Sequence, residues 1–147
     1  MSRYETYLIK AGLIYLILTG LLGVLFFFIP ALAIYFRTTH LHLGLIGFFL
    51  SMVMGVAYWM MPRPGGLRQE GLEAITFYLL NSGMILRLVA EPLWLYSSNE
   101  GFKILSAASG LLQFASMVVF AMAMWQRVRT REYILALRLK QQTTQER

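Results

Sequence analysis

The stretch RTTHLHLGLIGFFLSMVMGVAYWMMPR, residues 37–63, decides the fold of this chain. It is apolar, it is long enough to cross a bilayer, and both histidines of the chain stand near its beginning. A helix with about 100° per residue would place one stripe of polar and small residues along it: His40, Gly44, Gly47, Ser51, Gly55 and Tyr58. Below the imidazole, this stripe has almost no side chains. The pattern predicts that a flat macrocycle lies there, with an iron bound by His40.

The composition is that of a membrane protein. The chain has 147 residues, of which 58% are hydrophobic, and its mean hydropathy is +0.60, which is more apolar than a soluble domain of this size. It has no cysteine and therefore no Fe–S cluster or covalent haem attachment. The net charge of +6 gathers at the chain ends and in one connector, as membrane orientation requires. We therefore expect the lipid bilayer as a partner and no nucleic acid.

Four apolar runs predict four membrane-spanning helices, at about residues 7–36, 39–61, 72–96 and 102–125. The connectors between them are short, so neighbours in sequence should pack as antiparallel neighbours in space. The predicted fold is an all-α, integral membrane four-helix bundle with a single domain. A basic extension at residues 126–147 follows the last span.

The basic residues also predict the orientation of the bundle. The side that holds both termini and the second connector carries most of the lysines and arginines, whereas the opposite side holds only Arg37 and Lys103. By the positive-inside rule both termini should be cytoplasmic. We expect the protein in the inner (cytoplasmic) membrane of a prokaryote, with His40 near the outer surface.

Arg87 and Glu91 are the costly residues of the third run, since they are charged and lie one helical turn apart inside the membrane. One interpretation is a structural ion pair that holds the bundle together. The other is that Arg87 neutralises an anion such as a haem propionate, and the two interpretations are compatible. Arg37, one turn before His40, is a second candidate for such a contact.

The two histidines allow other interpretations as well. A histidine near a helix end is often only an interfacial residue. His42 points about 200° away from His40 on a regular helix, so it is our second choice as a metal ligand. A His-x-His pair would bind zinc or copper only if the helix start were unwound, and the chain offers no third ligand for it.

The motif Arg37-x-x-His40-x-His42, followed by Gly47, Gly55-Val56-Ala57-Tyr58 and Pro62-Arg63, resembles the second helix of the catalytic subunit of haem–copper oxidases. C-family oxidases and cytochrome-dependent nitric oxide reductases are the most similar types. The resemblance implies that His40 is an axial ligand of a low-spin haem b, and it implies no role for His42. Residues 80–92, with Asn81, Gly83, Arg87 and Glu91-Pro92, also resemble small four-helix proteins grouped with this family.

The chain departs from that family in its histidines. A complete member needs further histidines for a binuclear centre, and this chain has only His40 and His42, so it should not reduce oxygen or nitric oxide on its own. We expect a homodimer in which His40 of two copies binds one haem b, with Gly44, Gly47 and Gly55 at the contact. A methionine, water or an open position are the alternatives for the sixth ligand.

The sequence thus predicts a haem-b-binding membrane protein for electron transfer or for binding or sensing NO or O2, with a respiratory-chain redox partner. The alternative is a non-catalytic structural or assembly subunit of a respiratory membrane complex without a cofactor. No catalytic residues are predicted. The expected haem-site residues are His40, Arg37, Gly44, Gly47, Ser51 and Arg87.

Overall fold

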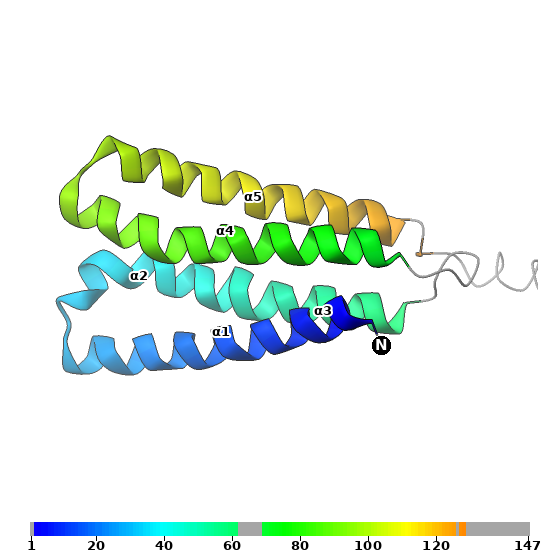
Figure 1. Cartoon of the computed structure of the whole chain (residues 1–147). Helices are drawn as coiled ribbons and strands as arrows, with labels where there is room; N and C mark the ends of the chain where they lie inside the picture. Colours follow the sequence, from blue (N-terminus) through cyan, green and yellow to red (C-terminus); the bar gives the residue numbers. More distant parts are fainter. Residues whose placement is uncertain (1, 62–68, 126, 129–147) are drawn as a thin grey trace, which may run out of the picture.

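The computed structural model describes residues 2–61, 69–125 and 127–128, and the described residues are helical without any strand. The elements in chain order are α1 (Arg3–Phe28), α2 (Leu32–His42), the π-helix η1 (Leu43–Leu50), α3 (Ser51–Met60), α4 (Glu70–Ser97) and α5 (Glu100–Trp125). Because α2, η1 and α3 follow one another without a break, they form one long helix (Figure 1). In the part of the chain that the structure describes, four helices are therefore long and apolar enough to span a membrane, as predicted.

The first turn lies at residues 29–31, before the point where the sequence predicted it. α1 starts at a capping box made by Ser2 and Glu5 and ends at Phe28, since Pro30 has no amide hydrogen to continue the helix. The sequence predicted a span that ran on to residue 36, but the helix ends before Pro30. The second span consequently begins at Leu32, so that Arg37 and His40 lie inside a helix.

The helices pack as two antiparallel hairpins. α1 packs mainly on η1 and α3, while α5 packs mainly on α4, and α4 joins the two hairpins by touching α1, α2 and η1. In Figure 1, α1 and α5 lie at opposite edges of the bundle. The two short turns, 29–31 and 98–99, lie together at one end of the bundle, and the chain's beginning and the end of α5 lie at the other. We call these the turn end and the terminal end.

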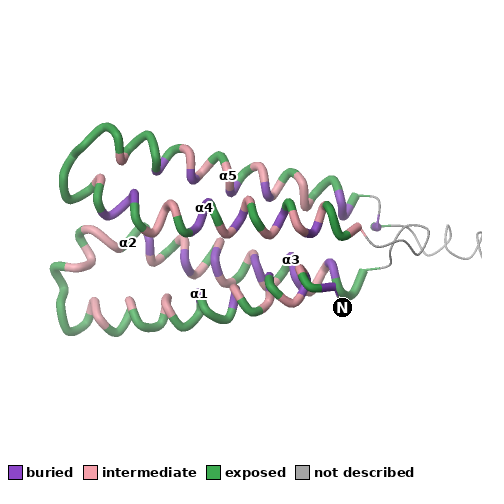
Figure 2. Tube along the Cα trace, viewed as in Figure 1, coloured by how far each residue is buried: buried purple, intermediate pink, exposed green. Residues whose placement is uncertain are grey.

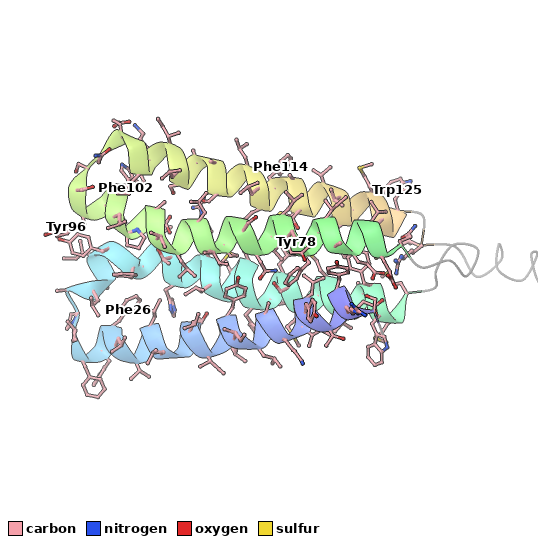
Figure 3. The ribbon with its side chains drawn as sticks, in the orientation of Figure 1. Phe26, Tyr78, Tyr96, Phe102, Phe114 and Trp125 are labelled. Carbon is pink, nitrogen blue, oxygen red and sulfur yellow. The ribbon has the colours of Figure 1, made fainter. Side chains whose placement is uncertain are left out.

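The outer sides of the bundle are apolar, as a bilayer requires. Buried residues face the inside of the bundle in Figure 2, whereas large hydrophobic side chains such as Ile17, Phe27, Leu111 and Phe114 are exposed. Tyr96 and Trp125, which are labelled in Figure 3, are exposed at opposite ends of the bundle. Aromatic side chains are common where a membrane meets water, so these two positions suit the two interfaces that the sequence predicts.

The π-helical segment η1 is the main local departure from the sequence prediction, which assumed a regular α-helix through residues 39–61. It starts directly after His42 and contains Gly44 and Gly47. π-helices are rare and occur frequently at functional sites. The predicted connector at residues 62–66 and the basic extension at residues 126–147, apart from Arg127 and Val128, lie outside the described residues.

Candidate functional site

The stripe predicted from the sequence lies along the second span, and α1 packs on most of it. Four of its six residues have a neighbour on α1: Gly23 for His40, Thr19 for Gly44, Tyr15 for Gly47 and Ile9 for Gly55. Tyr58, at the end of the stripe, bonds instead to Thr76 of α4. A Cβ atom added to Gly47 would lie 2.8 Å from Cγ of Tyr15, and one added to Gly55 would lie 2.7 Å from Cγ1 of Ile9. The sequence analysis placed a flat macrocycle or a second copy of the chain along this strip. At Gly47 and Gly55, side chains of α1 occupy that space instead.

His40 is enclosed between α2 and α1. Its ring lies edge-on against Phe26 of α1, with a centroid distance of 5.4 Å, and it is half-buried. The Nδ1 atom is buried and has no hydrogen-bond partner among the described residues. A histidine that binds a metal usually has its other ring nitrogen hydrogen-bonded to a carbonyl or a carboxylate. In this structure His40 lacks that contact.

Ser51 is the second stripe residue with an unsatisfied polar atom. It is fully buried, and its Oγ has no hydrogen-bond partner within the described part of the chain. A buried hydroxyl without a partner costs about 1–3 kcal/mol. Ser51 lies three turns along the helix from His40, so the two unsatisfied atoms are too far apart to form one site.

His42 has the contacts that His40 lacks. Its Nδ1 lies 2.8 Å from the carbonyl oxygen of Thr38 and 4.0 Å from Oε2 of Glu91. Because a carbonyl oxygen only accepts, Nδ1 must carry the proton of this hydrogen bond. The lone pair of Nε2 can then bind a metal ion. The His42 side chain is 24% exposed and lines a cavity of about 250 Å³ together with Thr38, Leu41, Leu45 and Ile46.

Glu91 and Arg87 connect His42 to the rest of the turn end. Thr39 Oγ1 donates to Oε2 of Glu91 over 2.8 Å, and Nη1 of Arg87 donates to Oε1 over 3.2 Å. Arg87 also donates from Nε to Oγ of Ser109 over 3.0 Å and from Nη2 to the carbonyl of Ser106 over 3.2 Å. We call this group the turn-end cluster: Thr39, His42, Arg87, Glu91 and Ser109.

The turn-end cluster joins α2, α4 and α5. It contains the ion pair that the sequence predicted between Arg87 and Glu91. All three guanidinium nitrogens of Arg87 are engaged in it, which leaves Arg87 less suited to a propionate than the sequence suggested. Arg37 is exposed on α2, and no ion pair joins it to any residue that the structure describes.

A second polar cluster at the terminal end was missed in the sequence. Arg127, only 3% exposed, donates to the carbonyl of Tyr58 over 2.9 Å and to Oε1 of Gln69 over 3.0 Å. Its Nη2 lies 3.5 Å from the Glu73 carboxylate, which also accepts from the hydroxyl of Ser2, and its guanidinium lies 5.0 Å from the centre of the Tyr58 ring. We call this group the terminal-end cluster: Ser2, Tyr58, Gln69, Glu73 and Arg127.

The two clusters limit the possible chemistry. No group of three or more histidine or acidic residues that could hold a metal ion occurs in the described ranges. A zinc or copper site built on both histidines is also unfavourable, since His40 packs against α1 whereas His42 lies beside Glu91 of α4. A single imidazole with a free Nε2 suits a cofactor that brings its own equatorial ligands, such as haem.

The geometry of these clusters carries the functional argument. A signal for the terminal-end cluster was present in the sequence as the capping box of Ser2 and Glu5, but nothing in the sequence placed Arg127 beside it.

Comparison with known proteins found no matching family model, no matching curated protein and no matching solved structure.

Proposed function

We propose that this chain is a multi-pass membrane protein that binds haem b through His42 and serves electron transfer or the binding of a diatomic gas. One observation carries the proposal. Nδ1 of His42 donates to the carbonyl of Thr38 and faces the carboxylate of Glu91, so that Nε2 can serve as an axial ligand. Haem, when bound, supplies one-electron redox chemistry or an iron position for a gas.

The neighbours of His42 support this choice of ligand. A ring nitrogen bonded to a carbonyl and close to a carboxylate fixes the orientation of the imidazole and raises its basicity as a ligand. The other cavity residues include Leu41, Leu45 and Ile46, which suit the apolar surface of a macrocycle. The resemblance to haem–copper oxidases implies His40 instead, but the geometry around His40 is less favourable, because its Nδ1 is buried without a partner.

A homodimer is part of the proposal. The cavity beside His42, at about 250 Å³, lies below the range of about 300–1,000 Å³ that is usual for ligand pockets. It would enclose only part of a macrocycle, so we propose that a second copy of the chain covers the rest. Arg37, exposed and one turn from the cavity residue Leu41, is the cation that we propose for a propionate.

The test is an absorption spectrum of the protein purified from its native membrane in a mild detergent. We expect a Soret band, about one haem per two chains, and loss of that band in H42A. H40A is the matched control, because it removes the other imidazole of the chain, two positions away, and should keep the band. Loss of the band in H40A alone would return the ligand to His40, and a colourless wild-type protein would overturn haem binding.

A second candidate function is a structural or assembly subunit without a cofactor. It is favoured by the filling of the glycine strip by α1 and by the use of all Arg87 nitrogens within the bundle. In that case the polar groups serve helix packing alone. A colourless wild-type protein whose stability depends equally on His40 and His42 would favour this candidate.

A further inference from the structure

Glu91 is held in one position by two neighbours. The residue is 4% exposed, and each carboxylate oxygen has a donor: Arg87 for Oε1, at 3.2 Å, and Thr39 for Oε2, at 2.8 Å. A carboxylate inside a membrane helix is costly, and these two contacts stabilise its charge. They also fix the side chain, so Oε2 stays 4.0 Å from Nδ1 of His42.

The position of the carboxylate favours one of the two neutral tautomers of the His42 imidazole. A neutral histidine carries one proton, on either Nδ1 or Nε2. The carbonyl of Thr38 and the carboxylate of Glu91 both lie on the Nδ1 side, so both favour a proton on Nδ1. The lone pair is then on Nε2, the nitrogen that would bind the iron.

We infer that Glu91 is a positioning residue that holds His42 in the Nδ1–H tautomer and thereby prepares Nε2 as the ligand atom. The inference rests on the proposed function for its purpose, but the tautomer itself is a property of the protein alone. Arg87 and Thr39 take part by fixing the carboxylate. The competing explanation is that the Arg87–Glu91 pair only joins α4 to its neighbours.

Glu91→Gln separates the two explanations. The amide keeps the size of the side chain, and its oxygen can still accept from Arg87 or Thr39, but it has no negative charge near His42. Glu100→Gln is the matched control, because it removes the same charge at the same end of the bundle from an exposed residue that pairs with Lys103. His40→Ala assigns the two histidine signals.

The measurement is nitrogen NMR of the two imidazoles in ¹⁵N-histidine-labelled protein in micelles, before haem is added and at an alkaline pH where both rings are neutral. We expect the Nδ1–H form of His42 in the wild type and in E100Q. In E91Q only the Thr38 carbonyl still favours that form, so we expect a minor but measurable share of the Nε2–H tautomer. When haem is added, E91Q should retain it about 10–100-fold more weakly than E100Q.

An unchanged His42 tautomer in E91Q would overturn the inference and leave Glu91 as a structural residue. If E91Q does not fold, Glu91→Asp provides a second test, because it keeps the charge but shortens the side chain and moves the carboxylate away from Nδ1, and a shift toward the second tautomer is then expected. If the wild-type protein binds no haem, but the tautomer of His42 still changes in E91Q, the result contradicts the proposed function and not the inference.

Discussion

The two ends of the bundle use the same chemistry in different surroundings. Each has an ion pair between an arginine and a glutamate of α4, at 3.2 Å for Arg87–Glu91 and at 3.5 Å for Arg127–Glu73. The side chains of the terminal-end pair are 0% exposed, whereas those of the turn-end pair are 14% and 6% exposed. The terminal-end pair is therefore closed to solvent and ligands, and the turn-end pair is not.

The difference shows which cluster has groups that packing alone does not explain. In the terminal-end cluster the arginine is satisfied by a carbonyl, an amide, a carboxylate and an aromatic ring, so its role is explained by packing. In the turn-end cluster the carboxylate also faces His42, whose ring lines a cavity and whose Nε2 has no hydrogen bond to the residues that the structure describes. For this reason our proposed function lies at the turn end, and we expect the terminal end to contribute more to the stability of the fold.

The largest expected effect is at Arg127. Arg127→Met should lower the free energy of unfolding by about 3–5 kcal/mol, because it leaves the carboxylate of Glu73 buried without its cation. Arg87→Met should cost less, since its partner Glu91 is not fully enclosed. Unfolding in mixed micelles, followed by circular dichroism, measures both.

The control for this comparison is the double variant E73Q/R127M, which removes the unpaired charge and should recover part of the lost stability. Equal costs at Arg127 and Arg87, or no cost at Arg127, would mean that the two clusters do not differ as their burial indicates.

A smaller effect is expected at Gly47, between the two clusters. A Cβ there would lie 2.8 Å from Tyr15 and 3.1 Å from Met84, so Gly47→Ala should destabilise the protein by about 1–3 kcal/mol through overpacking. Gly20→Ala on α1 is the matched control, because a Cβ there meets nothing within 4 Å, and it should be neutral or slightly stabilising. Thermal unfolding of the two variants in the same detergent gives the comparison, and equal midpoints would show that α1 does not fill the strip.

Much of the fold was predictable from local signals in the sequence. Apolar run length fixes the number of spans, and the cost of charge in a membrane made Arg87 and Glu91 a predictable pair. Pro30 was a visible signal too, but the apolar run continues on both sides of it to residue 36. Hydropathy alone therefore could not distinguish a kink from a helix end.

The candidate site was predictable only in part, since its decisive contacts join distant residues. Small residues spaced along one helix face predict a close neighbour, but they do not say whether that neighbour is a ligand, a second copy or, as here, α1. The preference for His42 over His40 depends on Glu91, which is 49 positions away in the chain, and on a regular helix His42 had no visible advantage. Arg127 stands in the basic run that the sequence assigned to an extension beyond the last span, so its burial gave no local signal.

The last prediction assigns the two clusters to sides of the membrane and should leave stability unchanged. The chain has no cysteine, so single cysteines at Ser98, at the turn end, and at Gly71, at the terminal end, can be labelled without background. Both positions are exposed, and a Cβ at Gly71 meets nothing within 4 Å. Because basic residues are concentrated on the side of the termini, a membrane-impermeant maleimide added to intact cells should label S98C and not G71C. Labelling of G71C alone would exchange the two sides, and the turn-end cluster would then face the cytoplasm.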